Sequence, residues 1–348
     1  MPRPRARRYD PRVTRAAALG VIACLVPLGC AAVAPAAEPA YRHFVVGNPA
    51  DVVTKTSGLL VLQGGGDDVD ENYVAMGAHA GGGDFVVLRA SGDDEYNEYI
   101  YKLCKCDSVA TIVFADRKAA FDPFVVATIR NAEALFIAGG DQSRYVRFWK
   151  GTPVEDAIHF VSAKPAPIGG TSAGMAIMGE MVYSAMTADS LTSAAGLGDP
   201  FHHDLTLERD FLRLPMLEGV LTDQHLHERD RIGRTVAMLA RLVHDGWASP
   251  ALAVAADRET ALHVDPADGT ATVHATAEHP TPFVYFLRTP GPPEVCAAGR
   301  PLTFRNVDVY RIGPGGGFDL RRWQGSGGIA YTLSVEDGVL TSSRGEIY

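Results

Sequence analysis

The stretch Ile168-Gly169-Gly170-Thr171-Ser172-Ala173-Gly174-Met175 contains a Gly-x-Ser-x-Gly pattern centred on Ser172. Residues 165–168 form a short apolar run before the pattern, and residues 175–181 after it have the composition of a helix. A sharp turn from strand to helix would hold the serine in a strained conformation, with glycines on both sides where a Cβ would clash. The sequence therefore predicts a nucleophilic Ser172 hydroxyl at the N-terminal end of a helix. The alternative is a tight turn in which the serine has no chemical role.

Apolar runs and helical patterns alternate on both sides of this stretch. The apolar runs are nearly continuous, which is typical of strands buried on both faces of a parallel sheet. We expect a doubly wound α/β fold with a mostly parallel sheet. The predicted strands are 58–63, 84–89, 109–114, 134–138, 165–168 and 220–222, and the predicted helices are 69–80, 124–131, 155–163 and 230–244.

Three glycine- and aspartate-rich loops follow predicted strands, at residues 64–67, 90–93 and 139–142. In open α/β sheets, ligands bind beyond the carboxyl ends of the strands. Ser172 lies in a fourth loop of this kind, so we expect the four loops to converge on one site.

The composition changes after about residue 265, where short strand patterns alternate with glycine-rich turns. We therefore divide the chain into a targeting segment at 1–37, an α/β domain at 38–265 and a small β-rich C-terminal extension at 266–348. The sequence does not fix the oligomeric state, and a homodimer is compatible with it.

The first 37 residues have the pattern of a secretory signal peptide. Six arginines precede an apolar run at 16–28, which is too short to span a bilayer and is followed by small residues. Cleavage near residues 34–36 is one processing route, and lipid attachment at Cys30 is a lower-ranked alternative. The sequence thus predicts an exported protein, periplasmic or extracellular, without a membrane span.

The formal net charge of the whole chain is −9. Because residues 1–37 carry six arginines and one aspartate, the remaining chain is more acidic still. Such a charge disfavours nucleic acids and anionic membranes as partners. It is compatible with a cationic substrate, although a solvated acidic surface is the commoner reason for it.

Five cysteines are present, and Cys24 and Cys30 lie in the targeting segment. Cys104, Cys106 and Cys296 have neither zinc-ligand spacing nor the even number of a disulfide framework, although one bond remains open. The sequence predicts no cofactor.

A nucleophilic serine requires a base, and His225 follows the apolar run 220–222 in the sequence Asp223-Gln224-His225. A histidine beside buried strand residues is also often a core residue, so both interpretations stay open. His225 and His227, together with residues 202–204, could instead bind a metal. No cysteine or carboxylate ligand has a characteristic spacing, and we therefore predict no metal site.

Three arginines, Arg229, Arg231 and Arg234, open the predicted helix after His225. Cations near a helix N-terminus oppose the helix dipole, so recognition of a carboxylate is a reasonable cause for them. The alternative is a solvated helix start, paired with Glu228 and Asp230.

Four patterns in the same order carry a resemblance to a known family. They are Gly139-Gly140-Asp141-Gln142, the stretch around Ser172, Asp223-Gln224-His225, and Arg229-x-Arg231-x-x-Arg234. Over roughly residues 57 to 265 the chain resembles the cyanophycinase family, which consists of serine exopeptidases related to peptidase E. The resemblance implies a fold like the class I glutamine amidotransferases, and thus a flavodoxin-like sheet.

The resemblance also implies an activity: cleavage of aspartyl or β-aspartyl peptides, such as β-Asp-Arg, through an acyl-enzyme. Ser172 would be the nucleophile and His225 the base, and the backbone of Gly140 and Ala173 would hold the oxyanion. The residues implied to line the substrate pocket are Gln142, Asp223, Gln224, Arg229, Arg231 and Arg234. The alternative is a catalytically degenerate member that binds a peptide or an amino acid.

The third member of the triad departs from the family pattern. The family acid is a glutamate in Asp-Glu-x-Thr-Ala, and this chain reads Asp257-Arg258-Glu259-Thr260-Ala261. The aligned position is Arg258, so Glu259 would need a bulge or a register change to point the same way. We take Glu259 as the expected acid, and Asp257 and Asp189 stay open.

Overall fold

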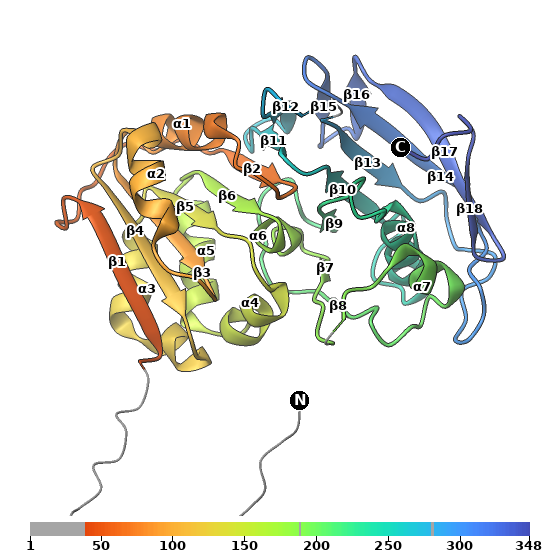
Figure 1. The fold of residues 1–348 in the computed structure, drawn as a ribbon, viewed down its shortest axis with the longest axis horizontal. Coiled ribbons are helices and arrows are strands. Elements are labelled where there is room, and N and C mark those ends of the chain that lie inside the picture. The colour runs from red at the N-terminus through yellow and green to blue at the C-terminus, as the bar shows by residue number, and fades with distance from the viewer. Residues whose placement is uncertain (1–38, 188, 280–281) are drawn as a thin grey trace, which may run out of the picture. The chain divides into compact units, whose positions relative to one another are not determined.

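The computed structural model describes residues 39–187, 189–279 and 282–348, which contain two large β-sheets (Figure 1). The predicted signal segment 1–37, with Cys30, lies outside the described residues. Residues Pro39–Tyr348 form one unit. None of the helices in the described residues is long and apolar enough to cross a membrane.

The first sheet has ten strands and is mixed. Its central five strands run parallel, in the order β4 (Ser108–Phe114), β3 (Asp84–Arg89), β5 (Ala134–Ile137), β6 (Ile168–Thr171) and β2 (Leu60–Gln63). Five antiparallel strands flank them: β1 (Tyr41–Gly47) beside β4, and beyond β2 β11 (Thr260–Val264), β12 (Thr270–Ala275), β15 (Gly317–Asp319) and β16 (Gln324–Ser326). The α/β architecture is confirmed. Half of the strands in this sheet are antiparallel, so the prediction of a mostly parallel sheet was wrong.

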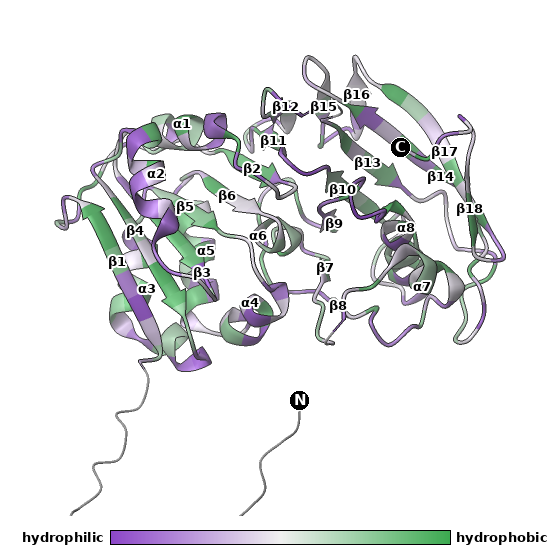
Figure 2. Cartoon of the chain, viewed as in Figure 1, coloured by the Kyte–Doolittle hydropathy of each residue, from purple (hydrophilic) through white to green (hydrophobic). Residues whose placement is uncertain are grey.

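Helices cover both faces of the parallel strands because successive side chains point to opposite sides. Leu88 packs in one core with α3 (Pro123–Asn131), α4 (Gln142–Trp149) and α5 (Pro153–Ala163). Its neighbour Val87 packs in another core with α1 (Asp70–His79) and α2 (Glu95–Cys104). Figure 2 shows β3, β4 and β5 as mainly hydrophobic. Each buried apolar side chain contributes about 1.5–3 kcal/mol, so both layers hold the sheet rigidly.

Aspartate caps fix where two helices begin. Asp122 accepts a hydrogen bond from Phe124 N at 2.8 Å, and α3 begins with Pro123, which needs no backbone donor. Asp141 accepts from Ser143 N at 2.9 Å and begins α4 directly after the loop that follows β5. Such a cap contributes about 1 kcal/mol. The second cap therefore holds the 139–141 loop at the carboxyl edge of the sheet.

The second sheet has six strands, ordered β18 (Val339–Ser342), β17 (Ile329–Glu336), β14 (Phe304–Ile312), β13 (Val284–Arg288), β10 (Leu252–Ala256) and β9 (Val220–Asp223). Only β9 and β10 in it are parallel. Helices α7 (Ser193–Gly198) and α8 (Ile232–His244) share its core. The short elements are η1 (Arg117–Phe121), α6 (Ala173–Ala176), β7 (Val182–Tyr183) and β8 (Leu207–Glu208). The strand before His225, expected in the sheet of Ser172, thus belongs to the other sheet.

Strands after residue 265 complete both sheets. β12 pairs with β11, and β13 pairs with β10, so each sheet combines strands from both sides of the expected boundary. The C-terminal extension is rich in strands, but in this structure it continues the two sheets instead of forming a sheet of its own.

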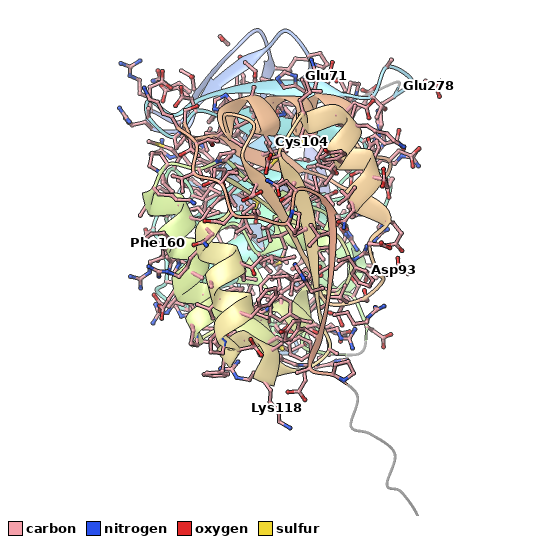
Figure 3. All side chains as sticks on the ribbon, turned by 90° about the vertical axis from the view of Figure 1, so that its left-hand side faces the viewer. Glu71, Asp93, Cys104, Lys118, Phe160 and Glu278 are labelled. Atoms are coloured by element: carbon pink, nitrogen blue, oxygen red, sulfur yellow. A yellow bond between two sulfur atoms is a disulfide. The ribbon has the colours of Figure 1, made fainter. Side chains whose placement is uncertain are left out.

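Cys104 and Cys106 form a disulfide between α2 and β4, which is the single bond the sequence left open, and Cys296 is a buried free thiol. In Figure 3, Cys104 and Lys118 lie at opposite ends of β4. The disulfide is therefore at the amino ends of the parallel strands, away from the edge at which Ser172 lies.

Candidate active site

Ser172 stands at a sharp turn between β6 and α6, with φ +50° and ψ −115°. An L-residue rarely adopts this conformation, and it costs on the order of 1–3 kcal/mol. A Cβ on Gly174 would lie 2.0 Å from the carbonyl oxygen of Ile137, and one on Gly170 would lie 2.7 Å from the Gly174 carbonyl carbon. Both glycines are therefore required for the turn, as the Gly-x-Ser-x-Gly pattern predicts.

The four loops converge as expected. Ser172 N donates to the carbonyl of Gln63 at the end of β2. A Cβ on Gly139 would lie 3.4 Å from Ser172 Cβ, and one on Gly140 would lie 3.4 Å from Ser91 Oγ. The end of β2 and the loop after β5 thus adjoin the serine, and the loop after β3 meets the loop after β5.

His225 lies against Ser172, with 3.0 Å between its Nε2 and the serine Oγ. It follows β9 and has φ +50°, and its backbone N donates to Gly64 O at 2.8 Å. Gly65 passes so close that a Cβ there would lie 2.2 Å from the ring Nε2. The β2 loop of one sheet thus holds the histidine from the other sheet against Ser172.

Glu228 is the carboxylate that contacts this histidine. Its Oε1 lies 2.6 Å from His225 Nδ1, which therefore donates a hydrogen bond to it and leaves Nε2 as an acceptor. Arg229 Nε lies 3.4 Å from the same oxygen, and Arg258 Nε lies 3.6 Å from Oε2. Sequence reasoning missed Glu228 and treated it as a partner of the helix arginines; its place three residues after His225 was the available signal.

Glu259, the expected acid, has other partners. It has φ +54° in the turn before β11, pairs with Arg258 and accepts a hydrogen bond from Thr276 Oγ1 at 3.4 Å. Of the two alternatives, Asp257 Oδ1 accepts from His227 N at 3.0 Å, and Asp189 lines the cavity beside Ser172. The expectation for Glu259 is corrected: the turn directs its carboxylate towards Arg258, and Glu228 occupies the place at His225.

Burial lowers the pKa of His225 to about 4, and the positive charge of Arg229 adds to this effect. Glu228 acts in the opposite direction and favours the protonated ring. The balance leaves the imidazole neutral at neutral pH. A neutral imidazole whose Nε2 faces a serine hydroxyl is able to accept its proton.

A cavity of about 230 Å³ opens beside Ser172. Four of the six predicted pocket residues line it, together with Gly140: Gln142, Gln224, Arg229 and Arg231. Burial and the charge of Arg234 lower the pKa of Arg231 to about 10, so its guanidinium stays charged at neutral pH. Arg231 Nη1 donates to Gln224 Oε1 at 2.6 Å, which fixes both side chains. Asp141 and Asp189 also line the cavity, so it offers both guanidinium groups and carboxylates to a ligand next to the nucleophile.

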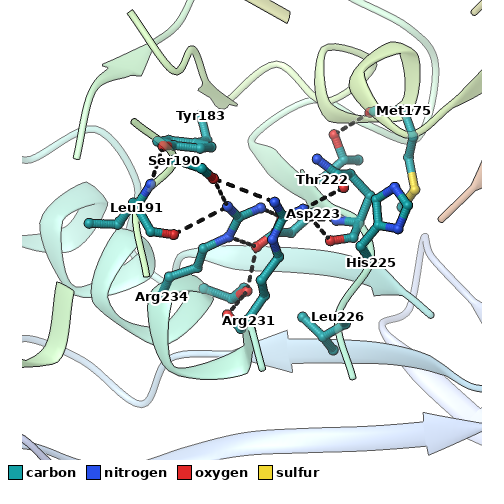
Figure 4. A network of polar contacts seen from close by, with 12 residues as sticks. Met175, Tyr183, Ser190, Leu191, Thr222, Asp223, His225, Leu226, Arg231 and Arg234 are labelled. Atoms are coloured by element: carbon teal, nitrogen blue, oxygen red, sulfur yellow. Dashed lines mark hydrogen bonds and ion pairs between the residues drawn. The ribbon is translucent and has the colours of Figure 1, made fainter. Parts of the chain in front are cut away.

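Asp223 and Arg234, the other two predicted pocket residues, do not line the cavity. They form a buried ion pair that Figure 4 shows beside Arg231. Burial alone would raise the pKa of Asp223, but the Arg234 guanidinium holds that pKa below its usual value. Their predicted role in binding is therefore corrected to support of the β9 end and the start of α8.

The structure also locates the two residues expected at the oxyanion. Ala173 directly follows Ser172 as the first residue of α6, and Gly140 lines the cavity with φ +143°. Gly140 shares a cavity with Ser172 and Ala173 adjoins Ser172 in the chain, and their role at the oxyanion stays a prediction.

A second cavity, of about 590 Å³, lies on the Glu228 side. Its lining is mainly acidic: Asp67, His227, Glu228, Asp257, Arg258, Glu259, Glu278 and His279. Asp257 is 1 % exposed, and its Oδ2 has no hydrogen-bond partner among the described residues. Burial raises the pKa of Asp257 to about 7. This cavity is suited to a cationic group, which would supply the missing partner.

The histidines considered for a metal do not form one group. The described residues bring His202, His203 and Asp204 together, without His225 or His227. His227 instead stacks on Tyr348.

The segment that contains Ser172 and His225 is similar to known proteins. Residues 90–241 match the model of Peptidase family S51, and this range includes Ser172 and His225. A cyanophycinase from Thermosynechococcus vestitus is 28% identical over 173 residues, which are 47% of this chain and 46% of that protein. The cyanophycinase of Nostoc sp. is 28% identical over 142 residues, or 40% and 44% of the two chains. The chain is thus similar to peptidase family S51 over this segment and to the cyanophycinases.

The S51 relationship covers part of the molecule. The chain spans less than half of the length of these cyanophycinases, and the family match ends before Arg258 and Glu259. A peptidase from an acI-B1 Actinobacterium has a similar fold, with a TM-score of 0.50, 15% identity and coverage of 76% of this chain and 98% of that one. The fold similarity thus extends further along the chain than the sequence match.

Proposed function

We propose that this protein is a serine exopeptidase that hydrolyses aspartyl or β-aspartyl peptides through an acyl-enzyme. The observation that carries the proposal is the chain of contacts from Ser172 to His225 at 3.0 Å and from His225 to Glu228 at 2.6 Å. A hydroxyl, a neutral imidazole and a carboxylate in this order form the arrangement that activates a serine for acyl transfer.

The proposed reaction uses these contacts. His225 Nε2 takes the hydroxyl proton as Ser172 Oγ forms a bond to the scissile carbonyl carbon, whose oxygen becomes the oxyanion. The backbone N–H groups of Ala173 and Gly140 would stabilise it, at about 3 kcal/mol per donor. The C–N bond then breaks, and the amine leaves with the proton from His225. Water attacks the ester, again through His225, and frees the acid and Ser172.

The two cavities support the substrate class. Arg229 and Arg231 in the smaller cavity suit the free carboxylate of an aspartyl residue on the acyl side. The acidic cavity on the His225 side suits a basic leaving group, because the leaving amine departs past the histidine. A β-Asp-Arg unit, as in cyanophycin-like peptides, has both features.

The test is hydrolysis of α-Asp-Arg, β-Asp-Arg and cyanophycin by the wild type, Ser172→Ala and His225→Ala, with and without a chelator. We expect turnover that both substitutions abolish and that the chelator leaves unchanged. Turnover that persists in Ser172→Ala or disappears with the chelator would refute the serine mechanism. Binding of β-Asp-Arg without turnover by the wild type would favour the degenerate binding protein instead.

The leaving-group side has its own test. We expect β-Asp-Arg to exceed β-Asp-Leu in kcat/KM by about tenfold, which corresponds to about 1.4 kcal/mol. Asp257→Asn should remove much of this preference, and Glu294→Gln, a surface substitution at an exposed ion pair, should not. Equal rates for both substrates would refute a cationic leaving-group site without affecting the serine mechanism.

A further inference from the structure

Tyr348, the last residue of the chain, lies against the loop that follows His225. Its hydroxyl donates to Asp230 Oδ1 at 2.8 Å and accepts from Ile232 N at 3.3 Å. Its ring stacks on His227, with 4.5 Å between the ring centroids and 22° between the planes. The tyrosine thus contacts the loop after His225 at His227 and Asp230, and it contacts the first residue of α8, Ile232.

The segment that carries Tyr348 is fixed to the second sheet. Tyr331, on β17, donates its hydroxyl to the Ile347 carbonyl at 3.2 Å. The Tyr285 ring, on β13, meets the Tyr348 ring edge-on at 6.4 Å. Burial raises the pKa of Tyr348, so its hydroxyl keeps its proton and remains a donor. The contacts therefore connect the loop to two packed strands.

The loop has local features that require such support. His225 and Asp230 are both non-glycine residues with positive φ, at +50° and +48°. Helix α8 begins without a side-chain cap from Arg231. The first turn instead takes its acceptors from other elements: Ser193 Oγ accepts from Arg234 N at 3.1 Å, and the Tyr348 hydroxyl accepts from Ile232 N. The tyrosine thus satisfies the first backbone N–H of the helix, which no other helix residue can pair.

Tyr348 lines neither cavity beside the catalytic pair. It contacts His227, which stands between His225 and Glu228 and lines the acidic cavity. A movement of this loop relative to β6 changes the 3.0 Å distance from His225 to Ser172, and a distortion within the loop changes the 2.6 Å distance from His225 to Glu228. A displacement of about 1 Å at such a site costs on the order of 10²-fold in rate.

We propose that Tyr348 is a positioning residue: it holds the loop that carries His225 and Glu228, so the C-terminal segment sets the catalytic rate without contact with the substrate. The inference rests on the proposed peptidase function. It assigns to the last strands of the second sheet and the tail after them a role in catalysis.

The test compares Tyr348→Phe, which keeps the stacking on His227, with removal of residue 348. Tyr310→Phe is the matched control, because its hydroxyl also accepts from a backbone N–H, that of Gly328, at 3.1 Å. We expect kcat for β-Asp-Arg to fall about 3- to 10-fold in Tyr348→Phe and about 10- to 100-fold after removal, with KM within twofold. The control should keep wild-type kcat.

A merely structural role would lower the melting temperature and leave kcat unchanged, and that result would overturn the proposal. So would an equal loss of kcat in Tyr310→Phe. Retention of the wild-type rate after removal of residue 348 would do the same.

Two further readouts do not need turnover, so they separate this inference from the proposed function. Hydrogen exchange at the Ile232 amide should accelerate in Tyr348→Phe. The low-field proton resonance of His225 Nδ1, assigned by its loss in Glu228→Gln, should shift or broaden after removal of residue 348. Both changes in a protein that does not hydrolyse β-Asp-Arg would show that Tyr348 holds the loop, while the lack of turnover would contradict the proposed function. Neither change in an active protein would overturn the positioning role and leave the proposed function standing.

Discussion

The carboxylate of Asp223 and the guanidinium of Arg234 pair through two contacts, with only 2 % and 1 % of their side chains exposed. One of these contacts, between Arg234 Nε and Asp223 Oδ2, is 3.1 Å long, and Thr235 Oγ1 donates to the same oxygen at 2.7 Å. The pair joins the end of β9 to the first turn of α8. It therefore fixes both ends of the loop that contains His225.

Arg234→Met should destabilise the protein by about 3–5 kcal/mol, because it leaves a buried carboxylate without its partner. Arg229→Met is the control: its side chain is 51% exposed, and its stability effect should stay within about 0.5 kcal/mol while KM rises. Urea denaturation and steady-state kinetics measure both. Equal stability losses would contradict the structural role of Arg234.

Glu228→Gln should lower kcat by about 10²- to 10⁴-fold, because the amide neither fixes the His225 tautomer nor stabilises the imidazolium. Glu259→Gln should keep kcat close to the wild type, since its carboxylate pairs with Arg258 and not with His225, and any effect through the acidic cavity should appear in KM. Comparison of kcat for the two variants decides which acid serves the histidine. Loss of activity in Glu259→Gln alone would restore the acid expected from the sequence.

The acid limb of kcat/KM should have its midpoint near pH 4, because the neutral form of His225 persists down to its pKa of about 4. Glu228→Gln removes the charge that favours protonation, so the limb should move to lower pH; Arg229→Gln should move it to higher pH. A midpoint near 6.5 would show an unperturbed histidine.

The same shift affects folding. An unfolded chain protonates this histidine near pH 6.5, and the folded protein does so only near pH 4. The folded state therefore loses stability as the pH falls from about 6.5 to about 4, and it loses no more from this group below that range. His225→Gln should flatten this part of the stability profile, which urea denaturation at several pH values measures.

Gly65→Ala should abolish activity, because the new Cβ would lie 2.2 Å from His225 Nε2. Gly315→Ala is the matched control, with φ +86° against +96° at Gly65 but no atom within 4 Å of its added Cβ. Both substitutions introduce similar backbone strain, so both should lower the melting temperature. A loss of kcat in both would attribute the effect to strain and not to the histidine.

Ser172→Gly and Ser172→Ala should both be inactive, but the glycine variant should be more stable by about 1 kcal/mol. Glycine adopts φ +50° and ψ −115° without the steric cost that a Cβ imposes, which outweighs its larger conformational freedom in the unfolded chain. Thermal unfolding of the two variants measures the difference. An alanine variant of equal or greater stability would show that the turn is unstrained.

The sequence predicted elements well where one short stretch determines the structure. The strand predicted at 84–89 coincides with β3, and the glycines of the Gly-x-Ser-x-Gly pattern make the turn at Ser172. The helix after Ser172 is shorter than predicted, because α6 ends at Ala176. Local hydrophobicity and backbone sterics are sufficient for such features.

Features that depend on distant contacts were not predicted. Glu228 reaches His225 only because the loop between them turns through a positive φ at His225, and that turn rests on a hydrogen bond to Gly64 in the other sheet. Arg234 is a buried structural residue because its guanidinium pairs with Asp223 at the end of β9. The spacing of the arginines along the helix does not predict this contact with another element.

The order of synthesis gives the sheet topology a further consequence. β2 is synthesised early. Its neighbour β11 is synthesised only after the turn that carries Ser172 and the loop that carries His225. Until then one side of β2 is an unpaired edge, which is open to pairing with other chains. The nascent protein thus exposes this edge during the interval in which Ser172 and His225 have been made but β11 has not.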